Sequence, residues 1–321
     1  MIHLPHLYSP KVSKKLLESI IIIIKIQKNM KQILITGATG QLGKEVINAL
    51  LKKTGAVAIS ALVRDSAKAG DLKAKGIDIR TGNYDDPASL VNAFKGIDTL
   101  YFVSSSEIAN RSRQHENVVK AAKNAQVRHV VYTSFQRRNE TASSPIAAVS
   151  AGHLAAEEAL KKSGLTYTIL KHGLYMDMLP VFLGDKILET GVIYQPAGEG
   201  KTAYTTRKDF AEAGAAILTG TGHENKVYEA YSGKAYSYPE IAKIISDITG
   251  KEITYVSPTN DEFIQTLTAA GVPMEYAGMF AGFAEAMRQG EFADTSNFME
   301  TILGRQPVSA EEYLKEVYKA S

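Results

Sequence analysis

The feature that most constrains this chain is a glycine-rich turn placed directly after a short apolar run. The run is Gln32-Ile33-Leu34-Ile35, the turn is Thr36-Gly37-Ala38-Thr39-Gly40-Gln41-Leu42-Gly43, and a helical pattern follows it. A strand, a tight turn and a helix in this order bring backbone N–H groups and the positive end of a helix against a diphosphate. The glycines are spaced G-x-x-G-x-x-G, so the context rather than the triplet predicts a dinucleotide site. The alternative is a turn that only packs a helix against a sheet.

Strand-like and helix-like patterns alternate from residue 31 to about residue 173. Apolar, β-branched runs lie at 32–36, 56–63, 77–80, 99–103, 129–133 and 167–170, and helix-length segments lie at 41–53, 66–75, 87–95, 109–125 and 145–162. This alternation is typical of parallel strands joined by right-handed crossovers, with helices on both faces of the sheet. The predicted fold class is therefore α/β, with a Rossmann-like, doubly wound parallel sheet.

The pattern divides the chain into three parts. We expect a dispensable extension at 1–29, a dinucleotide-binding core at 30–173, and a smaller substrate-side region at 174–321 that packs on the core. In the last part, helical patterns return at 208–219, 238–249 and 260–270, and 227–231 could form a further strand. A regulatory or membrane-touching tail is the alternative for the extension.

Composition excludes several functional classes. Residues 1–30 hold five lysines and one glutamate, a net charge of +4, so the +3 of the whole chain leaves −1 for the rest. A nearly neutral body indicates no nucleic-acid partner.

The five isoleucines at 20–24 are too few to cross a bilayer, so no membrane span is expected. The absence of cysteine excludes disulfides and cysteine–zinc sites and agrees with a cytoplasmic location. No H-E-x-x-H pattern occurs, and we expect no metal.

The end of the second predicted strand indicates which dinucleotide is bound. Arg64 stands where an NADP site offers an arginine to the 2′-phosphate, and Lys68 could add charge. In the alternative, Asp65 binds the ribose of NAD. Because ligands gather at the carboxyl ends of parallel strands, three further groups are candidates for cofactor contacts. These are Asn83 and Tyr84 near the adenine, Ser104, Ser105 and Ser106 near the diphosphate and nicotinamide ribose, and Thr133 near the cofactor or substrate.

The chemical side departs from the usual short-chain dehydrogenase pattern. Those enzymes use a Tyr and a Lys one helical turn apart, but here these positions hold Val149 and His153. His153 could hydrogen-bond a ribose hydroxyl or relay a proton, and its alternative is a packed core residue. At the end of the sixth strand, Lys171 and His172 are candidates for orienting the substrate, and Tyr175 for stacking on it; loop packing is the alternative for all three.

Glu157 and Glu158 lie four residues before Lys161 and Lys162. We expect these two pairs to form a solvated, salt-bridged face of the helix rather than an acid–base site.

Several segments resemble the NmrA-like branch of the atypical short-chain dehydrogenases, and within it the bacterial NADPH:quinone oxidoreductases of the type 2 kind. The resemblance rests on Ile35–Gly43, Leu62–Asp65 with Ala67-Lys68, Gly82–Asp86, Ser104–Glu107, Gln114–Val119, Val131–Ser134, Gly198–Lys201 and Thr206–Asp209. It covers roughly 30–320. It implies NADP bound by Gly37, Thr39, Gly40, Gln41, Leu42, Arg64 and the serine run, and a quinone pocket near Lys171 to Tyr175. Those reductases also lack the Tyr–Lys pair.

Three functions remain open at this point. The first is an NADPH-dependent oxidoreductase that passes hydride to a quinone or similar electron-poor carbonyl, whose weakly basic product needs no tyrosine acid. The second is an NAD(P)H-binding redox sensor without turnover. The third is a sugar-nucleotide epimerase, which would normally keep the Tyr–Lys pair. We expect a small-molecule partner, and the oligomeric state is open, with a homodimer among the alternatives.

Overall fold

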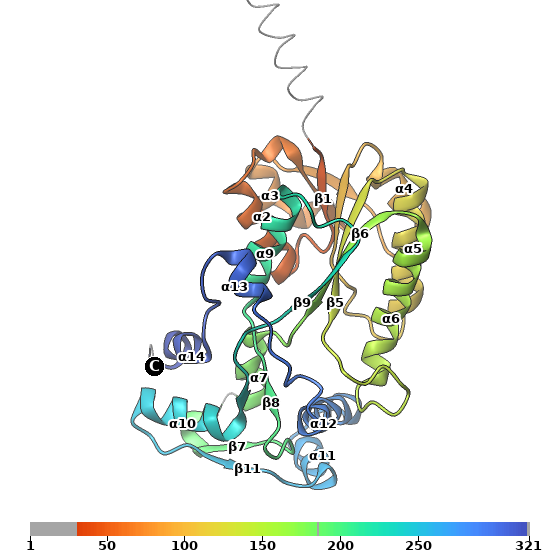
Figure 1. Ribbon diagram of the computed structural model, residues 1–321. Helices are drawn as coiled ribbons and strands as arrows, with labels where there is room; N and C mark the ends of the chain where they lie inside the picture. The colour runs from red at the N-terminus through yellow and green to blue at the C-terminus, as the bar shows by residue number, and fades with distance from the viewer. Residues whose placement is uncertain (1–30, 185, 320–321) are drawn as a thin grey trace, which may run out of the picture.

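A seven-stranded sheet forms the centre of the computed structural model, which describes residues 31–184 and 186–319 (Figure 1). The predicted extension at 1–29 lies outside the described residues. All neighbouring strands of this sheet pair in parallel, in the order β3-β2-β1-β4-β5-β6-β9. The strands are β1 (Ile33–Ile35), β2 (Ile59–Val63), β3 (Asp78–Thr81), β4 (Thr99–Phe102), β5 (His129–Phe135), β6 (Thr166–His172) and β9 (Lys226–Ala230).

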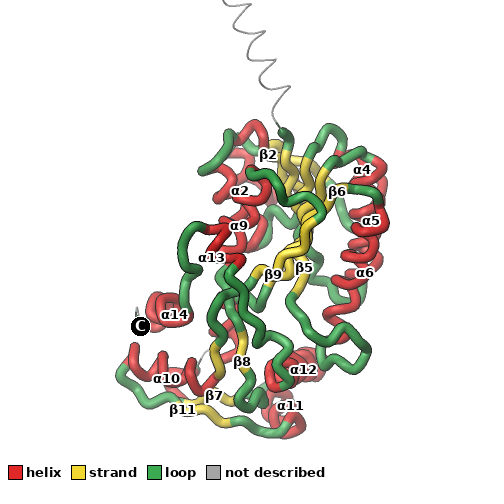
Figure 2. The backbone as a smooth tube through the Cα atoms, viewed as in Figure 1, coloured by secondary structure: helices red, strands yellow, loops and turns green. Residues whose placement is uncertain are grey.

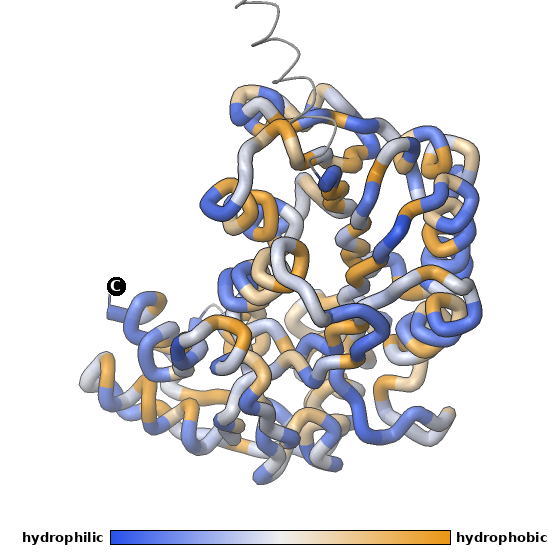
Figure 3. Tube along the Cα trace, turned by 45° about the horizontal axis from the view of Figure 1, so that its top comes forward, coloured by the Kyte–Doolittle hydropathy of each residue, from blue (hydrophilic) through white to orange (hydrophobic). Residues whose placement is uncertain are grey.

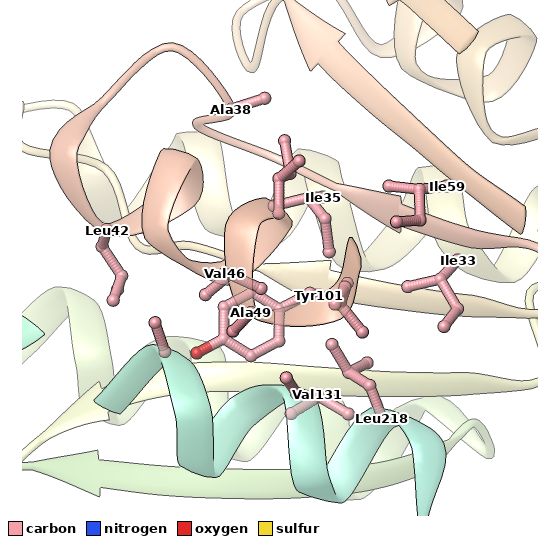
Figure 4. Packing of buried hydrophobic residues seen from close by; sticks show 14 of the residues in the cluster. Ile33, Ile35, Ala38, Leu42, Val46, Ala49, Ile59, Tyr101, Val131 and Leu218 are labelled. Carbon is pink, nitrogen blue, oxygen red and sulfur yellow. The ribbon is translucent and has the colours of Figure 1, made fainter. Parts of the chain in front are cut away.

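Helices cover both faces of this sheet, which confirms the doubly wound α/β fold. One face packs against α4 (Pro87–Phe94), α5 (Arg111–Asn124) and α6 (Ala147–Ser163). The other packs against α2 (Gln41–Leu51), α3 (Gly70–Ala74), α9 (Arg207–Thr219) and α13 (Phe298–Leu303). In Figure 4, Leu42, Val46 and Ala49 of α2 lie with Tyr101 of β4 and Leu218 of α9 in one apolar layer.

Local signals set the helix boundaries. Asp86 caps α4 by accepting hydrogen bonds from two backbone N–H groups, and Pro87 fills its first turn. Gly164, with φ of +81°, ends α6 in the left-handed conformation. The second strand is shorter than predicted, because residues 56–58 form a 3-10 turn, η1 (Ala56–Ala58), before it.

A second region lies beyond the carboxyl ends of the strands (Figures 1 and 2). It has its own apolar core and two two-stranded sheets, β10 with β8 and β11 with β7. Its elements are η3 (Met176–Met178), α7 (Leu179–Leu183), α8 (Ile187–Thr190), β7 (Val192–Tyr194), β8 (Lys201–Thr202), β10 (Tyr236–Ser237), α10 (Tyr238–Thr249), β11 (Thr254–Val256), α11 (Asn260–Ala269), α12 (Met274–Arg288) and α14 (Ala310–Tyr318). Hydrophobic and hydrophilic residues alternate along its peripheral helices (Figure 3).

The two regions interleave along the chain. The strand suggested at 227–231 is β9, which pairs with β6, and α9 and α13 also pack on the main sheet although they follow residue 173. The division at 173 therefore stays a prediction about domains. Among the described helices, none is long and apolar enough to span a membrane.

Candidate active site

The carboxyl ends of β1 to β4 surround a cleft of about 510 Å³. We call it the switch-point cleft, because the chain order along the sheet reverses between β1 and β4. Open α/β sheets bind their ligands at this point. It is lined by every residue predicted for the cofactor except Lys68 and Thr133: Gly37, Thr39, Gly40, Gln41, Leu42, Arg64, Asn83, Tyr84, Ser104, Ser105 and Ser106.

The glycine turn forms a tight cradle at one end of this cleft. Gly37 has a φ of +60°, which favours glycine, and its carbonyl accepts a hydrogen bond from Gly40 N at 2.9 Å. A Cβ atom on Gly43 would lie 2.2 Å from that carbonyl oxygen, so the turn requires glycine there. Among the described residues, no side chain caps the start of α2 and no acidic residue lies in its first turn. The N–H groups in the first turn of α2 are therefore available to an anion, and the cradle fits a diphosphate.

The end of β2 presents Arg64 to the cleft. Its side chain is 78% exposed, with Nη1 3.7 Å from Oε1 of Glu107. Asp65 Oδ1 instead accepts a hydrogen bond from a backbone N–H two residues on, at 2.9 Å, and caps a 3-10 turn, η2 (Ser66–Ala69). An exposed guanidinium here suits a 2′-phosphate, whereas the carboxylate that the NAD alternative needs already serves as a cap. Lys68 lies exposed in η2 and does not line the cleft.

Tyr84 lines the cleft, and Thr133 supports its wall from behind. The Tyr84 hydroxyl donates to the Val103 carbonyl at 2.8 Å, and burial raises the pKa of Tyr84 above its ordinary value. Thr133 Oγ1 accepts a hydrogen bond from Ser104 N at 3.0 Å. Thr133 therefore positions the serine run from behind.

A second cavity of about 240 Å³ adjoins the cleft, and Ser104 lines both. We call it the aromatic cavity, because most of its wall is apolar: Phe135 of β5, Val149 of α6, Leu174, Met178 of η3, Phe182 of α7, and Met279, Phe280 and Phe283 of α12. Its polar side chains are those of Arg111, Ser134, His153, His172 and Tyr175, besides Ser104. Aromatic and methionine walls of this kind suit a flat, polarizable ring system.

The cleft and the aromatic cavity also meet through a second pair of residues. Arg207, at the start of α9, lines the cleft, and its guanidinium carbon lies 4.3 Å from the ring centroid of Tyr175. Asp177 Oδ2 accepts a hydrogen bond from Arg207 N at 3.0 Å. The segment after β6 and the start of α9 are thus joined at the boundary between the two spaces.

Val149 and His153 both line the aromatic cavity, as one helical turn of separation predicts. His153 is buried, and burial, followed by the nearby charge of Arg111, lowers its pKa well below the ordinary value. The ring is therefore neutral. Its Nδ1 lies 2.8 Å from the Tyr132 hydroxyl.

Hydrogen bonds around His115 indicate which nitrogen of His153 carries the proton. Ser105 N can only donate, so His115 Nε2 accepts at 2.9 Å, and the His115 proton is on Nδ1, 3.2 Å from the Gly152 carbonyl. The Tyr132 hydroxyl, 3.3 Å from that Nδ1, is then free to donate to His153. This arrangement favours His153 as a neutral Nε2–H donor on a ring that lines the cavity.

The structure separates the three candidates at the end of β6. His172 lines the aromatic cavity and stacks on Phe210 with a centroid distance of 4.1 Å. Neither of its ring nitrogens has a partner among the described residues, and burial lowers its pKa to about 3. Tyr175 lines the same cavity, but the neighbouring Lys171 points to the other face of the strand, with Nζ 3.3 Å from Glu229 Oε1. A role for Lys171 in orienting a substrate therefore has no support in this geometry.

The predicted solvated face of α6 is wrong for Glu157. Lys162 does pair with Glu158 at the surface, but Glu157 is buried and accepts hydrogen bonds from Arg137 Nη2 at 3.0 Å on both carboxylate oxygens. It also accepts one from Ser134 Oγ. Because Arg137 comes from the loop after β5, spacing along α6 could not reveal this buried ion pair.

Comparison with known proteins agrees with this geometry. The NmrA-like family matches residues 29–314. The chain belongs to the NmrA-like family. It is 36% identical to quinone oxidoreductase 2 of Escherichia coli, over 90% of this chain and 99% of that protein.

Two solved structures of similar proteins have the same fold. The NADPH-dependent quinone oxidoreductase of Escherichia coli complexed with NADPH has a TM-score of 0.83 and 36% identity, covering 89% of this chain and 100% of that one. The triphenylmethane reductase of Citrobacter sp. complexed with NADP(H) has a TM-score of 0.82 and 36% identity, covering 89% and 99%.

This NmrA-like chain also holds cavity residues that sequence reasoning missed. Arg111 lines the aromatic cavity from α5, and the apolar groups of α12 close its far side. Gly152 was a local signal for the arginine, because a glycine within a helix costs stability unless another group approaches closely. A Cβ atom there would lie 2.7 Å from both Cγ and Cδ of Arg111. For α12, no comparable signal exists in the sequence.

Proposed function

We propose that this protein is an NADPH-dependent reductase that delivers hydride to a quinone or a similar electron-poor aromatic acceptor. The observation that carries the proposal is that Ser104 lines both the cleft with its glycine turn and the aromatic cavity. The names of the relatives, an NADPH-dependent quinone oxidoreductase and a triphenylmethane reductase complexed with NADP(H), support the same reaction class.

The residues of the switch-point cleft fit NADPH. The turn at Gly37–Gly43 would hold the diphosphate, Arg64 the 2′-phosphate, and the serine run the nicotinamide ribose. When bound, the nicotinamide supplies the hydride, which is two electrons and one hydrogen nucleus. The protein's part is to place the acceptor ring between apolar side chains, to exclude water, and to hold the reacting groups close together.

The absence of a Tyr–Lys pair favours a quinone over a simple ketone. Reduction of a ketone gives a strongly basic alkoxide, which needs a nearby acid, whereas reduction of a quinone gives a weakly basic phenolate that water can protonate. His153 offers this site a neutral hydrogen-bond donor in place of a tyrosine acid.

The decisive test is oxidation of NADPH by the purified protein, followed by absorbance with and without a simple benzoquinone, with NADH measured in parallel. We expect quinone-dependent oxidation above the uncatalysed rate, and a preference for NADPH. Binding of NADPH without turnover across a panel of quinones would contradict the proposal and favour the redox sensor.

Three further expectations belong to this proposal. We propose a cytoplasmic location, to be checked by cell fractionation, and a homodimer, to be checked by the molar mass of the purified protein in solution. A chain that starts at Met30 should bind NADPH as tightly as the full chain, because the cleft is built from residues 37–207.

A further inference from the structure

Arg111 is a buried cation without an anionic partner among the described residues. The residue is 7% exposed, and its guanidinium is held by backbone carbonyls: Nε donates to Ser105 O at 2.7 Å and Nη1 to Val149 O at 3.1 Å. The Arg111 side chain makes no ion pair and no further hydrogen bond within the described part of the chain, so Nη2 has no protein acceptor there. Burial lowers the pKa of Arg111, but an arginine stays charged in a protein.

The surroundings of Arg111 leave this charge uncompensated. Among the described residues that line the aromatic cavity, none is acidic, and both histidines are neutral. The groups that interact with Arg111 electrostatically are the neutral phenols of Tyr132 and Tyr175 and the neutral rings of His115 and His153, and none of these is an anion. Holding a buried cation without a counter-ion costs free energy. In return, the uncompensated guanidinium can stabilise negative charge on a ligand bound in the cavity.

The helix behind Arg111 is adapted to hold it. Gly152 gives up a side chain within α6, and a Cβ atom would lie 2.7 Å from both Cγ and Cδ of the arginine. The two carbonyl acceptors come from different elements, the loop after β4 and α6, so the guanidinium has a fixed orientation. Arg111 is thus placed in the wall of the cavity rather than left to move across it.

We propose that Arg111 selects the acceptor by charge: its guanidinium binds an acceptor oxygen that carries or develops negative charge, and it disfavours cationic acceptors. This inference rests on the proposed function and names the substrate class of the same site.

The chemistry of the two acceptor types explains the selection. A neutral quinone that accepts a hydride becomes a hydroquinone monoanion, and one proton from water then completes the hydroquinone, while NADPH becomes NADP⁺. The negative charge that develops on the quinone oxygen strengthens its hydrogen bond to the guanidinium. A cationic triphenylmethane dye becomes neutral when it accepts a hydride, so it is repelled on entry and develops no anionic oxygen.

A binding experiment tests the inference without turnover. Titration calorimetry on the full chain would compare three matched ligands that cannot be reduced: 2-naphthalenesulfonate, neutral 2-naphthalenemethanol and the cationic 2-naphthylmethyl-trimethylammonium ion. Measurements with saturating NADP⁺, and again without nucleotide, distinguish the aromatic cavity from the cleft. We expect the sulfonate to bind at least tenfold more tightly than the cation in both conditions.

Variants locate this preference at Arg111. Arg111→Met should reduce the ratio of anion to cation affinity about tenfold or more, and Arg111→Lys should keep part of it, because the charge stays while the two carbonyl anchors are lost. Gly152→Ala should also reduce the ratio, since it displaces the guanidinium without removing it. Lys120→Met is the matched control: it removes one positive charge from the exposed side of the same helix.

Turnover separates this inference from the proposed function. If the protein is active, two values of kcat/KM are compared, one for a sulfonated naphthoquinone and one for a cationic triphenylmethane dye. The ratio of the first to the second should fall in Arg111→Met and stay unchanged in Lys120→Met. If no acceptor is reduced but anion-selective binding depends on Arg111, the proposed function fails and the charge selection stands. Equal binding of anion and cation by the unmodified protein, or an unchanged ratio in a folded Arg111→Met protein, overturns the inference.

Discussion

Removing the guanidinium of Arg64 should separate the two nicotinamide cofactors. We expect Arg64→Ala to weaken NADPH binding about 10- to 30-fold and to change NADH binding less than twofold, because only NADPH carries a 2′-phosphate. Since the Arg64 side chain is 78% exposed, the contact acts in a medium close to water. At about 4 Å in water, two unit charges gain about 1 kcal/mol, and a phosphate with a charge near −1.5 to −2 gains about 1.5–2 kcal/mol.

The same structure supplies a second arm of this experiment. Glu107 lies 3.7 Å from Arg64 and must share the guanidinium with a bound phosphate, so Glu107→Gln should tighten NADPH binding slightly. Affinities would be measured by fluorescence titration at low and high salt, and the NADPH preference should shrink as salt screens the contact. Arg113→Ala removes an exposed charge from a different pair and serves as the control. Equal losses for NADPH and NADH in Arg64→Ala would refute the assignment.

Other contacts in the described residues lead to three further predictions. Gly43→Ala should weaken NADPH binding at least tenfold, because its Cβ atom would lie 2.2 Å from a backbone oxygen of the turn, whereas Gly70→Ala, with open space around it, should not. Glu157→Gln should lower the free energy of unfolding by about 2 kcal/mol in urea titrations, since it removes the buried one of the two carboxylates that pair with Arg137 and leaves only the half-exposed Glu140. The exposed Glu158→Gln should change it by less than about 0.5 kcal/mol. The pKa of His172 is about 3 in the folded protein and 6.5 in the unfolded chain, so only the unfolded chain binds its proton between these values, and stability falls as pH drops below about 6.5. His172 should contribute about 1.4 kcal/mol per pH unit to the fall in the free energy of unfolding, and His172→Phe should remove this contribution. Identical pH slopes of stability for the unmodified protein and the variant would contradict the assignment.

The cofactor half of the site could be predicted because its signals are local. The turn at Gly37–Gly43, the strand ends that carry Arg64 and the serine run, and the cap at Asp86 each depend on neighbouring residues in the sequence. Parallel topology then brings all strand ends to one edge of the sheet. Of the residues predicted to contact the cofactor, only Lys68 and Thr133 lie outside the cleft. Lys68 sits in an exposed turn, and Thr133 supports the backbone of Ser104.

The acceptor half could be predicted only in part. The helical spacing of Val149 and His153 correctly placed both on one face, but strand alternation, which the sequence also contains, separates Lys171 from His172. The buried pair of Glu157 and Arg137 and the aromatic wall from α12 depend on contacts between distant segments. No periodicity along one element carries that information.

The cleft and the aromatic cavity depend on different parts of the fold. The cleft is formed by the sheet and its first turns, whereas much of the wall of the aromatic cavity comes from η3, α7 and α12, which lie beyond the sheet. Changes in these segments can therefore alter the acceptor while the diphosphate cradle stays intact. Arg111 belongs instead to the sheet-packed helix α5, as Val149 and His153 belong to α6, so the polar part of this cavity is built on the main sheet. The Ser105 carbonyl that anchors Arg111 also lies in the serine run that lines the cleft. The position of the guanidinium is therefore fixed relative to the cofactor half of the site.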